Sequence, residues 1–222
     1  DEPRLELFRF QDRLFLVVNI RLKSTSQGTE TRLPYLRLLW KKELEEIFEK
    51  IIPSDAGPVS LRLNFHGGNG QNVHLTEGEA VDEHTLANYG QWPILSPMPV
   101  LAHELGHHLF LFDRYQRSIH ELICSSYLPG IETHIMGGKH LMNKRDLYLD
   151  PIDIVSAVDI LARQVDSAKG PTLGLADIQF ELGEYASAGK MYLKLYKKYR
   201  EKKTLAHAAL RGVTLSEIRL FE

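Results

Sequence analysis

The feature that most constrains this chain is a short segment with two histidines inside an apolar stretch. His103 and His107 stand four residues apart, and Glu104 directly follows the first histidine. Residues 99–102 and 109–112 on either side are mostly apolar. Residues four apart lie on one face of an α-helix, and a helix that is apolar on most sides is buried. Because buried histidines and carboxylates need partners, the sequence predicts a buried helix in which both histidines share a metal ion.

The pattern His-Glu-x-x-His is the signature of zinc hydrolases, in which the glutamate acts on a metal-activated water. Catalytic zinc usually takes three protein ligands and keeps one position open. Asp113 is our first candidate for the third ligand. It stands ten residues after His103, which along a continuous helix is a rise of about 15 Å. The helix must therefore end soon after His107, and the chain must turn back.

Other assignments stay open at this point. Rival third ligands come from later in the chain. Glu121 and Glu132 are the stronger rivals, and His134 and His140 are the weaker ones. His108 is next to His107 and points off the metal face, so we expect it to pack or to support a ligand. The alternative for the motif is an amphipathic helix whose histidines are ordinary polar or core residues. The alternative for Asp113 is a surface carboxylate paired with Arg114 or a nearby lysine.

Three segments together resemble a known family. Residues 103–113 resemble the zinc-binding stretch of the metzincin peptidases, in which the third ligand follows the first histidine by ten residues. The form with aspartate there, with Tyr115 two residues later, is similar to the snapalysin-like and immune-inhibitor-like secreted bacterial peptidases. Residues 133–138 resemble the Met-turn of that family, with Met136 beneath the metal. Residues 149–155 resemble the start of the helix that closes its catalytic domain.

This resemblance implies a fold, a cofactor and a set of roles. The fold class would be α+β, with a metzincin-like (zincin) catalytic domain built from a small mixed sheet, an active-site helix and a C-terminal helix. Zn²⁺ would be held by His103, His107 and Asp113, with Glu104 as the catalytic base. The relatives are secreted or exported, which favours the same for this chain although its compartment stays open.

One position departs from the family pattern. The family has glycine three residues after the second histidine, where the helix breaks and turns, and this chain has Phe110. Glycine takes a positive φ at little cost, whereas phenylalanine does not. Either the turn is made differently here, or Asp113 does not reach the metal by the family's route.

The first hundred residues predict the scaffold of such a domain. Apolar alternation predicts a hairpin from residues 5–10 and 14–22, followed by a polar loop over 23–32. Pro34 is expected to open a helix that runs to about Ile52, because apolar residues there recur at three-four spacing. Strands are predicted at 59–65 and 72–75. By analogy with the family, the second of these would be an edge strand that pairs with extended substrate. Residues 78–99 are predicted to form a long loop that lines the cleft.

Residues 167–171 are small and turn-prone, which indicates a boundary. We therefore predict a metzincin-like domain over residues 1–168 and a helical segment over 171–222. Spacings within 175–192 are similar to a tetratricopeptide helix pair, with a third helix over 204–220; an ordinary helical hairpin is the alternative. A single repeat rarely stands alone, so the pair packs on the catalytic domain or the natural chain continues. A protein partner could bind through these helices.

Charge and cysteine content further narrow the possible partners and the possible types of protein. The 27 basic and 29 acidic residues give a net charge of −2, which offers no electrostatic case for a nucleic-acid partner. The basic run over 194–203 is interpreted as a solvated helix face. The lone Cys124 allows no intrachain disulfide, and no stretch approaches the roughly 20 apolar residues of a membrane span. The chain begins at Asp1 without methionine or signal peptide, so we expect either a processed form or a piece cut from a longer chain, in which case an export signal would be missing from view.

The expected function is a zinc-dependent endopeptidase that hydrolyses peptide bonds in a protein or peptide substrate by metal-activated water. The first alternative is a non-peptidase zinc amidohydrolase with the same active-site chemistry. The second is a protein-interaction module with a structural or vestigial zinc site. An intact Glu104 argues against the second, because a structural site needs no base.

Overall fold

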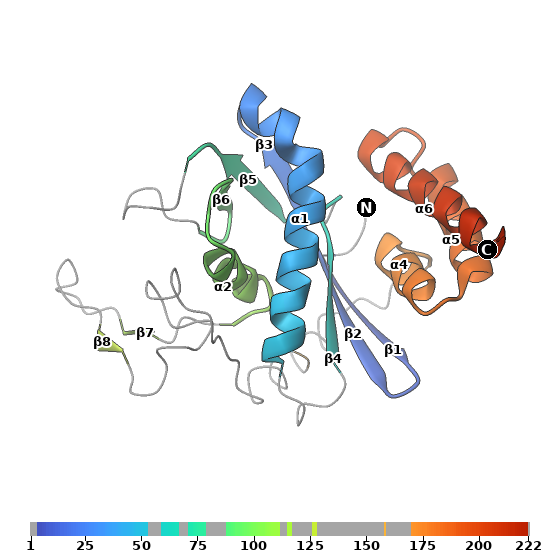
Figure 1. Ribbon diagram of the computed structural model, residues 1–222, viewed down its shortest axis with the longest axis horizontal. Helices are drawn as coiled ribbons and strands as arrows, with labels where there is room; N and C mark the ends of the chain where they lie inside the picture. Colours follow the sequence, from blue (N-terminus) through green and yellow to red (C-terminus); the bar gives the residue numbers. More distant parts are fainter. Residues whose placement is uncertain are drawn as a thin grey trace.

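The computed structural model describes residues 4–52, 59–66, 71–78, 88–111, 115–116, 126–127, 158 and 170–221. Within these residues the fold is α+β, with two small three-stranded sheets and five helices (Figure 1). The first sheet has the order β1-β2-β4, and the second has the order β3-β5-β6. A short pair, β7 (Tyr115–Gln116) and β8 (Ser126–Tyr127), is antiparallel.

The first sheet begins with the predicted hairpin. β1 (Leu5–Phe10) runs antiparallel to β2 (Arg13–Asn19), and β2 runs parallel to β4 (Val59–Asn64), so the sheet is mixed. The predicted strand over 14–22 is not continuous. After β2 the chain changes partners at Ile20, whose N–H bonds to Asn64, and continues as β3 (Arg21–Ser24).

The second sheet corrects two expectations. β3 pairs in parallel with β5 (Asn72–Thr76), and β5 pairs in parallel with β6 (Gln91–Pro93). The strand predicted at residues 72–75 therefore lies in the middle of this sheet, because both of its edges are already paired, and it is not the edge strand. Part of the predicted loop over 78–99 is also regular structure, since it contributes β6 and the first residues of α2 (Met98–His108).

The long helix α1 (Gln27–Ile51) starts seven residues before the predicted position. Ser26 and Thr29 form a capping box, in which the Ser26 hydroxyl accepts from the Thr29 N–H at 3.1 Å and the Ser26 N–H donates to the Thr29 hydroxyl at 3.1 Å. This cap satisfies the first orphan donors of the helix, so the helix begins in the segment predicted as a polar loop. Pro34 lies inside the helix and does not open it.

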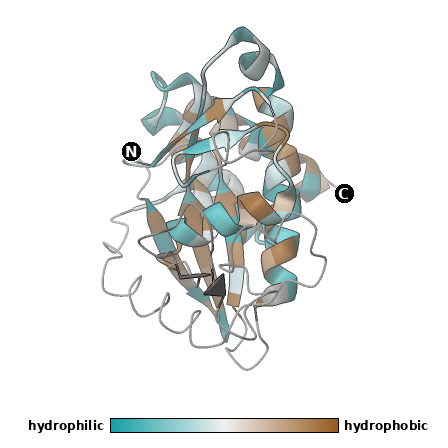
Figure 2. Cartoon of the chain, turned by 90° about the vertical axis from the view of Figure 1, so that its left-hand side faces the viewer, coloured by the Kyte–Doolittle hydropathy of each residue, from teal (hydrophilic) through white to brown (hydrophobic). Residues whose placement is uncertain are grey.

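The main core lies between the sheets, α1 and α2. Its largest side chains are two tryptophans, Trp40 of α1 and Trp92 of β6, whose ring centroids are 5.7 Å apart. Leu101 and Leu105 of α2 are fully buried in the same cluster. Figure 2 shows apolar residues along the strands and along the helices that cover them. Burial of this face holds α2 against the sheets, and with it the histidine motif.

The C-terminal residues form α4 (Leu173–Glu181), α5 (Tyr185–Lys198) and α6 (Lys203–Phe221). The predicted third helix is present, and the three helices share their own cluster of buried side chains. α4 packs on the first sheet, where Ile178 joins Phe15 and Val17 of β2 in a third apolar cluster. Leu16 and Val18 point to the other face, into the main core. Both faces of β2 are therefore buried, which explains its continuous apolar run.

None of the helices in the described ranges combines the length and apolar composition that crossing a membrane requires.

Candidate metal centre

The predicted motif lies on a buried helix. α2 covers residues 98–108, and Pro99 occupies its first turn, where a missing N–H costs nothing. His103 and Glu104 are each 7% exposed, and His107 is half-buried. The apolar neighbours of the motif, Leu101 and Leu105, are buried in the main core. The apolar flanks thus place the polar residues of the motif against the protein interior, as the sequence predicts.

The two histidines lie side by side. Their ring centroids are 4.9 Å apart, and the rings stand at 88° to one another. Zinc binds histidine nitrogen at about 2.0–2.1 Å, so two rings at this separation can share one ion. Among the residues that the structure describes, no group of three or more histidine, cysteine or carboxylate side chains comes together around a metal position.

The ring of His107 is oriented by the backbone that follows the helix. Its Nδ1 lies 3.0 Å from the carbonyl oxygen of Leu111. A carbonyl only accepts hydrogen bonds, so Nδ1 carries the proton, and the lone pair is on Nε2. Metal-binding histidines commonly donate their other ring N–H to a carbonyl or carboxylate, which fixes the tautomer and the ring orientation. The tautomer and ring orientation of His107 therefore fit a zinc ligand that binds through Nε2.

The turn after α2 resolves part of the question raised by Phe110. The Phe110 N–H bonds to His107 O and the Leu111 N–H bonds to Gly106 O, both at 3.1 Å. These two bonds define a Schellman motif, whose residue after the cap is usually a left-handed glycine. Phe110 itself takes that conformation, with φ of 64°. The turn is therefore made with the positive φ that glycine would supply, so of the two alternatives given above the one with a different turn does not apply.

Phe110 and its neighbour His108 are held by groups distant in sequence. The guanidinium of Arg4 lies over the Phe110 ring, 5.1 Å from its centroid. His108 is 1% exposed, and its Nδ1 lies 2.8 Å from the side-chain amide of Gln71. Burial, reinforced by the charge of Arg4, lowers the pKa of His108 to about 4. A neutral, buried His108 agrees with the expectation that it packs.

Sequence reasoning missed these supports. The Leu111 carbonyl is a backbone group that every residue has, so no sequence signal marks it. Gln71 and Arg4 come from distant parts of the sequence and carry no motif. The remaining predicted site residues lie outside the described residues. They are Asp113, Met136 and the rivals Glu121, Glu132, His134 and His140.

Comparison with known proteins adds no assignment: no protein-family model, curated protein or solved structure matches this chain.

Proposed function

We propose that this protein is a zinc-dependent endopeptidase with a metzincin-like catalytic domain. The observation that carries the proposal is the arrangement on α2. Two histidine rings lie together on a buried helix, a buried glutamate stands between them in sequence, and one ring is fixed by a backbone carbonyl. An ordinary core helix needs none of these features.

His103 and His107 would hold the ion, with Asp113 as the third ligand predicted from the sequence. When bound, zinc supplies Lewis-acid activation of water and polarises the scissile carbonyl. Glu104 has the role of general base. It accepts a proton from the attacking water and then delivers it to the leaving amine. Burial of Glu104 excludes bulk water, which strengthens its electrostatic interactions.

The test combines metal content with turnover. Elemental analysis of the chain purified without chelator should give about one zinc per chain, the number a single catalytic centre holds. Glu104→Gln should keep the zinc and abolish cleavage of a broad fluorogenic casein substrate, whereas His107→Gln should lose both. His74→Gln changes an exposed histidine on β5 and should change neither. Zinc-free protein that takes up no zinc would overturn the proposal, and so would full activity in Glu104→Gln.

A non-peptidase zinc amidohydrolase keeps the same roles for these residues. It is distinguished by substrate, because the zinc-loaded chain would leave casein intact and hydrolyse small amides in a Glu104-dependent manner.

One observation favours the interaction-module alternative. α6 exposes a series of large apolar side chains: Leu210, Leu215, Ile218, Leu220 and Phe221, the last 92% exposed. In that case zinc would be retained without any Glu104-dependent hydrolysis, and changes on α6 would abolish capture of a partner.

A further inference from the structure

A second site lies apart from the histidine motif. A cavity of about 610 Å³ is lined by residues of α1, the end of β4 and the helices α4, α5 and α6. Figure 1 shows α2 on one side of α1 and the C-terminal helices on the other. Cavities of this size are typical of small-molecule sites, which are mostly apolar with a few polar groups that fix orientation. This cavity has no role in the proposed hydrolysis.

The walls of the cavity are largely apolar. They include Leu63, Phe65, Leu173 and Phe180. Leu38 of α1 and Leu215 of α6 stand at the rim, where they are 54% and 39% exposed. An apolar body could therefore enter past these two leucines and bury its surface against the walls.

The charged side chains that line the cavity are mainly basic. Arginine and lysine contribute four positive charges, from Arg37, Lys41, Lys203 and Arg211, against two carboxylates, Asp177 and Glu181. With neutral histidines the lining has a net charge of +2. Both carboxylates are already engaged: Glu181 accepts from Arg62 at 2.6 Å, and Asp177 accepts from the Tyr192 hydroxyl. Lys41 pairs with Glu45 at 2.9 Å.

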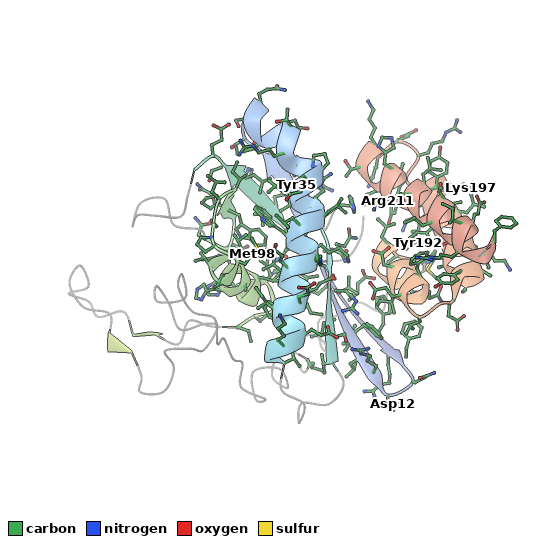
Figure 3. All side chains as sticks on the ribbon, in the orientation of Figure 1. Asp12, Tyr35, Met98, Tyr192, Lys197 and Arg211 are labelled. Atoms are coloured by element: carbon green, nitrogen blue, oxygen red, sulfur yellow. The ribbon has the colours of Figure 1, made fainter. Side chains whose placement is uncertain are left out.

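The two arginines differ from Lys41. In the described part of the chain, neither Arg37 nor Arg211 forms an ion pair. Nε of Arg37 is shielded from solvent and has no hydrogen-bond partner among those residues. Arg211 lies on the α1-facing side of the helical segment (Figure 3).

His66 is affected by the same positively charged side chains. It lines the cavity, and its Nδ1 is also shielded without a partner among the described residues. Burial lowers the pKa of His66 to about 4, and the charges of Arg37, Lys41 and Arg211 add to the effect. These cations therefore act on one point inside the cavity.

We propose that this cavity binds a small organic anion with an apolar body, whose anionic oxygens pair with the guanidinium groups of Arg37 and Arg211. The apolar body packs between Leu38 and Leu215 and against the walls behind them. An anion at this point neutralises the excess positive charge. A cation of the same shape would meet Arg37 and Arg211 and be repelled.

The probe is 1-anilinonaphthalene-8-sulfonate, which combines a sulfonate with an aromatic body and fluoresces when its body is buried. The full chain should bind it saturably. Arg37→Gln and Arg211→Gln together should weaken its affinity by about tenfold or more, which corresponds to about 1.4 kcal/mol. Arg32→Gln, on the same helix α1 but outside the cavity lining, is the matched control and should leave the affinity unchanged.

Two further measurements guard against loss of fold and against general surface binding. Leu38→Glu places a carboxylate at an exposed rim position and should weaken the probe without lowering the melting temperature. Dodecanoate should displace the probe, whereas dodecylamine, with the same chain and the opposite charge, should not. Unchanged affinity in the folded double arginine variant would overturn the proposal, and so would equal displacement by both competitors.

Discussion

At the scale of single residues, the backbone conformation of Phe110 helps to orient His107, a predicted zinc ligand. The left-handed turn brings the Leu111 carbonyl back to within 3.0 Å of His107 Nδ1. Left-handed backbone costs a non-glycine residue roughly 1–2 kcal/mol. Packing of the Phe110 ring against the main core and under Arg4 offsets this cost. A strained turn is thus retained where it orients a predicted metal ligand.

This conformation can be tested with a pair of isomeric side chains. Phe110→Ile and Phe110→Leu remove the same number of atoms, but β-branching makes positive φ more costly. We expect the isoleucine variant to be less stable by about 1 kcal/mol, measured as the free energy of unfolding in urea. Equal stabilities would contradict a left-handed Phe110.

His66 gives a prediction about pH. Its pKa is about 4 in the folded chain against about 6.5 when unfolded, so the unfolded state binds the proton more readily between these values. Stability from this group is therefore complete above pH 6.5 and is lost as the pH falls toward 4. His66→Gln should reduce the loss of unfolding free energy between pH 7 and pH 5 by about 1–2 kcal/mol. A variant with the native pH dependence would show that His66 titrates normally.

At the scale of elements, the start of α1 depends on its cap. Ser26→Ala removes the acceptor for the Thr29 N–H, together with a contact to Glu77. We expect a loss of about 1 kcal/mol in the free energy of unfolding. Thr31→Ala, at an exposed position near the start of the same helix, is the control and should cost less than about 0.5 kcal/mol. Equal losses would show that the cap contributes nothing particular.

The same helix shows how far the sequence predicts the elements. Apolar periodicity predicts the body of α1 and the apolar flanks predict α2, because both patterns reflect burial. The start of α1 was missed because Pro34 is a strong signal for a first turn, whereas a capping box closed by threonine is a weak one. The place of β5 in its sheet depends on β6, which has only three residues and no detectable period. At the site, the sequence predicts His103, Glu104 and His107 as a motif. It does not predict the groups that pack against this region, namely the Leu111 carbonyl, Gln71 and Arg4, because they carry no motif.

At the scale of the whole molecule, α4 joins the C-terminal helical segment to the N-terminal part, which is built from the two three-stranded sheets, α1 and α2. Gly174 of α4 lies so close to β2 that a Cβ there would stand 2.7 Å from Val17 Cγ1. Arg62 of β4 and Glu181 of α4 form an ion pair nearby at 2.6 Å. The helical segment therefore covers an apolar face of the first sheet, and one wall of the proposed anion cavity depends on this contact.

Close packing at Gly174 predicts that the two parts unfold together. Gly174→Ala should push α4 away from β2 and lower stability by about 1–3 kcal/mol, although alanine favours helices. Both tryptophans lie in the main core, so their fluorescence follows unfolding of the N-terminal part. Circular dichroism also follows unfolding of the helical segment. If α4 couples the two parts, both signals shift to the same lower urea midpoint. Lys194→Ala, at an exposed position of α5, should shift neither. A lower midpoint by circular dichroism with an unchanged tryptophan midpoint would mean that the helical segment unfolds on its own, since the sheet would then not sense the loss of α4.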